Sequence, residues 1–253
     1  MDIGKMTIRS IEQLFLAGTP DALTLDALRQ DQRLAVQRIL ARFERAQQER
    51  QRVDALYSYE YQAQQEGLQY VAGVDEAGRG PLAGPVVVAA VILPMGLFLP
   101  KINDSKKLSA KTRDTLYDLI QDKAIAVACS VIDEKTIDRI NIYQATINGM
   151  YESIFSLHPE PQKVLIDAVP LDRLSIPSLS IIRGDAKSAS IAAASIIAKV
   201  TRDRLMLKYD EQYPGYGFAQ HKGYGTAQHL AAIRKLGPCP IHRRSFEPIR
   251  SMQ

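Results

Sequence analysis

The sequence predicts an α/β fold in which helices flank a mixed central sheet, with a helical extension before it. Two observations support this prediction. In residues 1–66, apolar side chains recur at helical spacing. In residues 67–253, three early strand-like runs joined by short links are followed by strands that alternate with helices. We therefore expect an N-terminal extension, residues 1–66, and a main domain, residues 67–253.

The extension should contain several helices. Thr7 can cap a short helix that Gly18 ends. Thr19-Pro20 resembles a second helix start, with proline at the first helical position. From Asp31, the apolar residues follow helical spacing to about Glu66. Because no catalytic constellation occurs here, we expect the extension to pack on the main domain or to assist binding; a mobile tail is the alternative.

The main domain should contain both strands and helices. A run rich in β-branched residues indicates a strand, and wider apolar spacing indicates a helix. We expect strands over residues 69–75, 86–93, 124–132, 163–167 and 180–184, and helices over residues 109–121, 135–157 and 186–209. The tail from Pro214 should be loop and short helix. The order of the strands in the sheet does not follow from the sequence.

Composition and charge restrict the class of protein. The two cysteines, Cys129 and Cys239, are isolated, which argues against zinc and suits a reducing compartment. No apolar run approaches the roughly 20 residues that span a bilayer, and the chain starts without a signal-peptide pattern. We therefore expect a cytoplasmic protein without a membrane partner. Basic residues concentrate after Phe218, which suits a polyanion or simply a solvated basic face.

Two adjacent carboxylates, Asp75 and Glu76, stand at the end of an apolar strand and before a glycine-rich turn. Neighbouring side chains in a strand point to opposite faces, so both can serve one site only if the strand ends or bends there. Paired carboxylates also repel each other unless a cation neutralises them. Taken alone, the pair is more typical of an exposed turn with two solvated acids.

The turn after these acids contains Gly78, Gly80 and Ala83, which satisfy the GxGxxA spacing of dinucleotide-binding loops. That interpretation fails because a β-branched run, not a helix, follows the turn. The chain also lacks the GxxxxGK[ST] pattern of a P-loop. The glycines can instead bring the backbone close to a ligand, and Arg79 at the tip could meet a phosphate.

Two further acids follow predicted strands. Asp167 ends the apolar run Val164–Ile166, and Asp185 opens the last long helix, where it could also be an ordinary N-cap. Four acids at strand ends suit a site, because sites in α/β sheets form there. Oxygen ligands without histidine or cysteine favour Mg²⁺ or Mn²⁺. Two such ions, roughly 4 Å apart, can cleave a phosphodiester.

The sequence resembles the ribonuclease HII family over residues 67–248. The stretches that carry the resemblance are Gly73–Val87, Asp104–Leu108, Leu165–Asp167, Gly184–Ser188, Ala192–Met206 with Ala198–Arg204, His221–Thr226 with His229, and Pro240–Arg243, in the order of the family. The resemblance implies a ribonuclease H-like fold and shows no departure at the catalytic positions. Residues 1–66 lie outside this pattern and resemble the helical extension of some Gram-positive members.

The resemblance also implies roles for individual residues. Asp75, Glu76, Asp167 and Asp185 would hold two divalent cations, Mn²⁺ or Mg²⁺, for hydrolysis that leaves 5′-phosphate and 3′-hydroxyl ends. It further implies that Gly78, Arg79 and Gly80 recognise the ribose 2′-hydroxyl and that the ring of Tyr224 stacks on a deoxyribose. Lys106 and Lys187 are candidate phosphate contacts, with ordinary solvated lysines as the alternative.

The expected substrate is an RNA/DNA hybrid or duplex DNA that contains ribonucleotides, bound by a monomer. Two alternatives remain open. The same fold and acids could serve a nuclease or strand-transfer enzyme that acts on DNA alone, which would cut an all-DNA duplex equally well. The basic C-terminal region could instead belong to a non-catalytic nucleic-acid-binding module, which would cleave nothing in Mg²⁺ or Mn²⁺.

Overall fold

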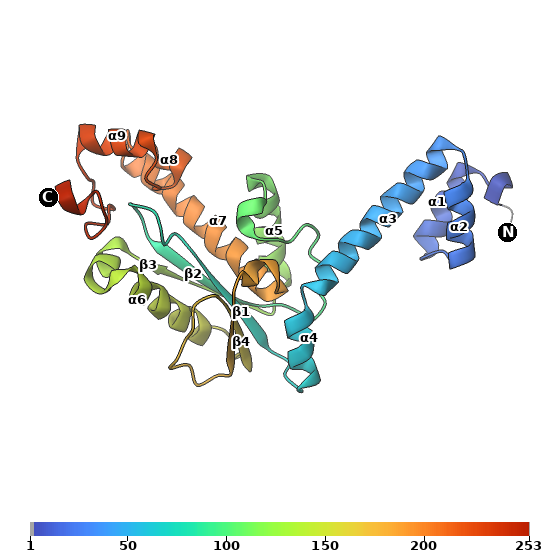
Figure 1. The fold of residues 1–253 in the computed structure, drawn as a ribbon, viewed down its shortest axis with the longest axis horizontal. Helices are drawn as coiled ribbons and strands as arrows, with labels where there is room; N and C mark the ends of the chain where they lie inside the picture. The colour runs from blue at the N-terminus through green and yellow to red at the C-terminus, as the bar shows by residue number, and fades with distance from the viewer. Residues whose placement is uncertain (1–2, 253) are drawn as a thin grey trace. The chain divides into compact units, whose positions relative to one another are not determined.

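The computed structural model describes residues 3–252 of the chain. Contacts divide the chain into two compact units, one up to Val53 and one from Asp54 onward. The helices and strands of both are labelled in Figure 1.

The first unit is a small helical cluster. It contains η1 (Ile3–Lys5), α1 (Ile8–Ala17), α2 (Ala22–Gln30) and most of α3 (Leu34–Ala55). Its buried residues are Ile3, Ile11, Leu28, Val36, Ile39 and Leu40. As predicted, Thr7 caps α1 and Gly18 follows its last residue. The second helix starts later than predicted, because the Asp21 carboxylate, which accepts the N–H of Thr24, is its cap.

Helix α4 (Ser58–Gln65) belongs to the second unit. The buried carboxylate of Glu60 accepts hydrogen bonds from the hydroxyl of Ser188 (2.7 Å) and the N–H of Ser190 (3.0 Å). Ala63 packs in an apolar cluster with Val71 and Ile191. The division between the compact units therefore precedes α4, whereas the extension expected from the sequence includes that helix.

The second unit is built on a five-stranded mixed sheet, as the sequence predicts. Its strands are β1 (Val71–Ala77), β2 (Val86–Ile92), β3 (Ala126–Ile132), β4 (Lys163–Asp167) and β5 (Ser178–Ile181). They lie in the order β3-β2-β1-β4-β5. The first three strands pair antiparallel, whereas β4 pairs parallel with both β1 and β5. The middle of the sheet is therefore β1, which carries the paired acids.

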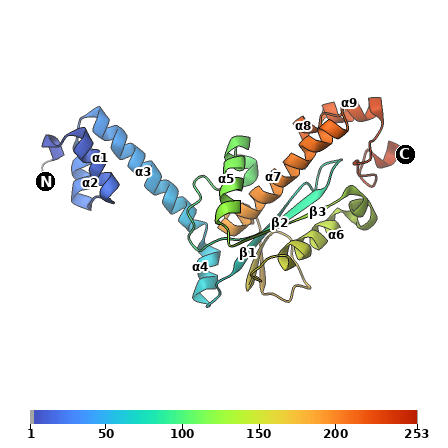
Figure 2. The same cartoon turned by 180° about the vertical axis from the view of Figure 1, so that it is seen from behind.

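Helices cover both faces of the sheet, with α6 on one side and α7 on the other (Figures 1 and 2). Their bounds are α6 (Glu134–Phe155) and α7 (Ala189–Gln212), and α5 (Ala110–Lys123) packs against α7. On β1, Ala72 and Val74 pack in the cluster with α6, and the opposite face meets the start of α7. There Gly73 is required, because a Cβ would lie 2.0 Å from the carbonyl carbon of Ser190.

Two boundaries differ from the prediction in ways that matter for the acids. Strand β1 does not end at Asp75 and Glu76 but continues to Ala77, paired with β2 throughout. The long helix begins at Ala189, and its cap is Ser188, whose hydroxyl accepts the N–H of Ile191. Asp185 lies earlier, in the short 3-10 helix η3 (Gly184–Ala186), so it is not the N-cap of the long helix.

The remaining elements follow α7. They are α8 (Phe218–His221), α9 (Ala227–Leu236) and η4 (Arg250–Met252), and η2 (Ser105–Lys107) precedes α5. Leu82 and Ala83 of the glycine-rich turn pack with Phe218 and Ile241 from this C-terminal part. None of the helices in residues 3–252 combines the length and the apolar character that a membrane crossing requires.

Candidate active site

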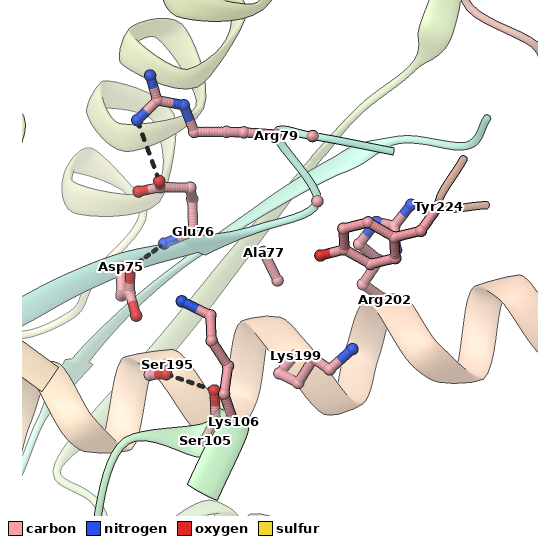
Figure 3. A pocket seen from close by; sticks show the side chains of 12 residues that line it. Asp75, Glu76, Ala77, Arg79, Ser105, Lys106, Ser195, Lys199, Arg202 and Tyr224 are labelled. Atoms are coloured by element: carbon pink, nitrogen blue, oxygen red, sulfur yellow. Dashed lines mark hydrogen bonds and ion pairs between the residues drawn. The ribbon is translucent and has the colours of Figure 1, made fainter. Parts of the chain in front are cut away.

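A pocket opens between the glycine-rich turn, η2 and α7 (Figure 3). Its lining comes from four separate segments of the second unit. The lining residues are Asp75, Glu76, Ala77, Gly78, Arg79, Gly80, Ser105, Lys106, Ser195, Lys199, Arg202 and Tyr224. Seven of the predicted site residues therefore meet at one pocket.

The register of the parallel pair β1–β4 brings Asp167 beside Asp75. Val74 lies opposite Ile166, so each acid is the next residue on its strand. Val74 and Ile166 face α6 in one core cluster. Because side chains alternate along a strand, Asp75 and Asp167 both point to the α7 side.

Asp185 reaches the same region from η3. The N–H of Gly184 donates to Oδ1 of Asp167 at 2.7 Å, which ties η3 to the end of β4. Asp104, the residue that caps η2, lies close enough to Asp185 to raise its pKa. Asp104 is thus a fifth carboxylate at this site that sequence reasoning did not assign.

Asp75 and Glu76 point to opposite sides of β1, as alternation along a strand requires, but both line the pocket, because β1 ends one residue later, at Ala77 (Figure 3). One carboxylate oxygen of Glu76 forms an ion pair with Arg79 at 3.3 Å. The other oxygen, Oε2, is buried and has no hydrogen-bond partner. A buried carboxylate oxygen without a partner is unfavourable and would be relieved by a bound cation.

Burial and like charge perturb the titration of these acids. Burial first, and then the charges of Glu76 and Asp167, raise the pKa of Asp75 well above its usual value. Burial and the neighbouring carboxylates raise the pKa of Asp185 to about 6. Burial opposes the charge of Lys106, but the surrounding carboxylates outweigh it and raise the Lys106 pKa. Lys106 extends toward Asp75 in Figure 3 and offsets part of the negative charge.

Within residues 3–252, no three His, Cys, Asp or Glu side chains are already gathered into a metal-binding group. The acids nevertheless have the chemistry that a hard divalent cation requires: oxygen donors, mutual repulsion and one unsatisfied buried oxygen, Oε2 of Glu76. Asp75, Glu76, Asp167 and Asp185 therefore fit such ions as candidate ligands.

Gly78 and Gly80 both line the pocket, but a side chain would have a different effect at each position. Gly78 has a φ of 98°, and a Cβ there would lie 2.1 Å from Nε of Arg202. A Cβ on Gly80 would instead make an ordinary contact, 3.9 Å from a ring carbon of Tyr224. The turn and the Tyr224 ring therefore form adjacent walls of one pocket.

The two predicted phosphate-contacting lysines differ. Lys106 lines the pocket, whereas Lys187 does not and follows η3. Sequence reasoning assigned no role to Lys199, which lines the pocket and pairs with Asp203 at 2.8 Å. Lys199 lies within the stretch Ala198–Arg204, which carries part of the family resemblance. The sequence therefore indicates the importance of this stretch but not a role for Lys199 itself.

Three buried histidines support the Tyr224 turn. Nδ1 of His229 donates to the carbonyl of Tyr224 at 2.9 Å, and its Nε2 lies 3.0 Å from Nε2 of His242. Burial lowers the pKa of both histidines to about 4, so both are neutral at pH 7. His221 stacks on His229 at 4.3 Å between ring centres. The histidines therefore make local hydrogen bonds, as expected from the sequence.

Comparisons with known proteins identify relatives over nearly the whole chain. A family model described as "Ribonuclease HII" matches residues 72–249, and one described as "Ribonuclease HII N-terminal domain" matches residues 7–64. A ribonuclease HII of Enterococcus faecalis is 50% identical over 256 residues, covering 99% of this chain and 100% of that protein.

Two solved structures share the fold. The ribonuclease H2 of Pyrococcus horikoshii is 28% identical, with a TM-score of 0.63 over 72% of this chain and 96% of that one. Bst-RNase HIII in complex with Mn²⁺ is 20% identical, with a TM-score of 0.54 over 74% of this chain and 70% of that one.

Proposed function

The chain belongs to the ribonuclease HII family of endoribonucleases, and from this premise we propose that it hydrolyses the RNA strand of RNA/DNA hybrids. We also propose that it cuts at ribonucleotides embedded in duplex DNA. The single observation that carries the proposal is the pocket in which the backbone of Gly78–Gly80, the ring of Tyr224 and the acids of β1 meet.

The carboxylates of Asp75, Glu76, Asp167 and Asp185 would hold two divalent cations, Mn²⁺ or Mg²⁺. Bound at that position, the two ions would supply positive charge for activation of the attacking water and stabilisation of the leaving oxygen. The charge crowding at Asp75 and the unpartnered Oε2 of Glu76 support this assignment. The expected products carry 5′-phosphate and 3′-hydroxyl ends.

The other pocket residues would bind and orient the substrate. The backbone and side chain of Gly78, Arg79 and Gly80 would recognise the ribose 2′-hydroxyl, the group that distinguishes RNA from DNA. Tyr224 would stack on the deoxyribose that follows the cut. Lys106, already among the acids, would contact the phosphate next to the scissile bond.

The N-terminal region has a separate proposed role. Residues 1–66 would assist binding of the duplex, and residues 67–253 would form the catalytic domain. The match of an N-terminal family model to residues 7–64 supports this division. We further propose that the protein acts as a monomer in the cytoplasm on RNA/DNA hybrids and on ribonucleotide-containing duplex DNA.

The test is cleavage of three matched duplexes: an RNA/DNA hybrid, a DNA duplex with one ribonucleotide, and all-DNA. Wild type in Mn²⁺ or Mg²⁺ should cut the first two and leave the third intact. Asp75→Asn should abolish cleavage, whereas Asp118→Asn, a control at an exposed acid on α5, should not. Equal cutting of the all-DNA duplex would instead support a DNA nuclease, and binding without cleavage would support a non-catalytic module.

A further inference from the structure

Two buried arginines near the pocket have no part in the proposed chemistry. Arg202 on α7 is 1% exposed, and Arg243 near the C-terminus is 0% exposed. Arginine is rarely buried so completely without a carboxylate partner. Every hydrogen bond that these two guanidiniums make in residues 3–252 goes to a backbone carbonyl.

Arg243 holds the two ends of the glycine-rich turn together. Its guanidinium donates to the carbonyls of Gly78 (2.6 Å), Arg79 (2.8 Å) and Gly84 (2.9 Å). A peptide bond is planar and trans, so an inward carbonyl directs the following N–H the opposite way. With the carbonyls of Gly78 and Arg79 bound, the N–H groups of Arg79 and Gly80 point away from Arg243. These two donors are therefore available to the pocket that the turn lines.

Arg202 connects the same turn to the segment that carries Tyr224. It donates to the carbonyls of Ala83 (3.1 Å), Pro85 (2.9 Å) and Lys222 (3.0 Å). Its guanidinium also lies 6.0 Å from the centre of the Tyr224 ring. Arg202 thereby joins both walls of the pocket.

The guanidinium groups of Arg202 and Arg243 are held close together, and this proximity of two positive charges costs free energy. Burial and the charge of Arg202 lower the pKa of Arg243 to about 9. Gly78 has no Cβ where Nε of Arg202 lies against it, so the turn is shaped around that side chain. Such a pair of buried like charges costs stability, which suits a local functional requirement better than general stabilisation.

We propose that Arg202 and Arg243 are positioning residues that fix the amide donors of Arg79 and Gly80 relative to the Tyr224 ring, and thereby determine how strongly the enzyme prefers a ribonucleotide. This inference rests on the proposed function. It assigns no contact with the substrate to either arginine.

The experiment compares Arg243→Lys and Arg202→Lys with wild type. Lysine keeps the positive charge, but its single ammonium cannot reproduce the planar fork that holds three carbonyls. We expect kcat/KM on the duplex with one ribonucleotide to fall by roughly 10- to 100-fold, mainly through kcat, because a misplacement of about 1 Å has an effect of that size. The Mn²⁺ affinity, measured by calorimetry, and the affinity for all-DNA duplex should both stay within about twofold of wild type. Neither kind of binding depends on the amide donors of Arg79 and Gly80.

Hydrogen exchange gives a readout that does not depend on activity. Amides in residues 78–85 should exchange faster in both variants than in wild type. The matched control is Arg33→Lys, because Arg33 also donates to two backbone carbonyls, those of Met6 and Ile3, but lies in the first unit. That variant should keep wild-type discrimination and wild-type exchange in residues 78–85.

The proposal is overturned if folded Arg243→Lys and Arg202→Lys keep wild-type kcat/KM, or if Mn²⁺ affinity falls in parallel with activity. If a variant does not fold, hydrogen exchange of the wild-type protein provides the test. Adding the ribonucleotide duplex should slow exchange of the amides of Arg79 and Gly80, and unchanged exchange overturns the inference. Failure of the proposed function looks different, because wild type would then show no preference for the ribonucleotide duplex.

Discussion

Replacing Asp185 by asparagine should stabilise the metal-free protein while abolishing cleavage. The pKa of Asp185 is raised from 3.8 to about 6, first by burial and then by neighbouring carboxylates. At 1.36 kcal/mol for each pKa unit, this difference corresponds to about 3 kcal/mol of unfavourable free energy in the ionised state. Screening by nearby solvent reduces the figure to about 1–2 kcal/mol. Asparagine removes the charge and keeps a hydrogen-bonding group beside Asp104.

The gain should depend on pH with a definite sign. Asp185 has a folded-state pKa above its unfolded value of 3.8, so wild-type stability from this group is complete below pH 3.8 and is lost as the pH rises through about 6. Asp185→Asn does not titrate at this position. The two proteins should therefore differ little at pH 4, and the variant should be the more stable at pH 7.5.

The assay is thermal unfolding in chelator and in Mn²⁺. In chelator at pH 7.5, the variant should melt roughly 2–8 °C above wild type, the shift expected for about 1–2 kcal/mol in a chain of this size. Added Mn²⁺ should raise the wild-type melting temperature more than that of the variant, since a ligand is lost. A variant that is less stable than wild type in chelator at pH 7.5 would refute the reasoning that crowded carboxylates destabilise the metal-free site.

Three further predictions test the pocket, the ions and the division of the chain. Gly80→Ala should fold normally but lower kcat/KM on a ribonucleotide duplex about 10-fold, because the added methyl lies 3.9 Å from the Tyr224 ring, in the space between the walls; unchanged kinetics would contradict this. Chelator should stop cleavage, and added Mn²⁺ should restore it, as a gel assay would show. Removing residues 1–53 should leave a folded second unit, whereas removing residues 1–66 also deletes Glu60 and should lower its unfolding free energy by at least about 1–3 kcal/mol; equal melting of the two truncations would argue against this role.

The parts of the fold that local chemistry determines could be predicted from the sequence. Strand β4 occupies the predicted residues Lys163–Asp167. An apolar run this short, ended by an acid, favours a buried strand over a helix. Thr7 and Gly18 delimit α1 as expected, since capping depends on neighbouring residues only.

Predictions that depended on competing neighbours were less accurate. By residue type Asp185 is a plausible cap for the long helix, but the observed cap is Ser188, whose hydroxyl also donates to Glu60, while Asp185 faces Asp104. The glycine-rich turn that follows predicts that β1 ends at Asp75. Pairing with β2 extends the strand to Ala77 instead.

The candidate site shows the same division. Asp75, Glu76 and the glycine-rich turn are contiguous, so their common location follows from the sequence. The support beneath them does not, because Arg243 reaches the carbonyl of Gly78 across 165 positions of chain. Neither helical nor strand periodicity carries information about contacts at such separation.

The parallel register between β1 and β4 places Asp167 beside Asp75, so the proposed activity depends on correct alignment of these two strands. A shift of β4 by one residue would keep a ladder of backbone hydrogen bonds but turn Asp167 toward α6 and Ile166 toward α7. The penalty for burying a carboxylate among apolar side chains opposes that shift. Substitutions that loosen the α6 side of the sheet, well away from the pocket, could therefore yield folded protein in which a fraction of the molecules is inactive.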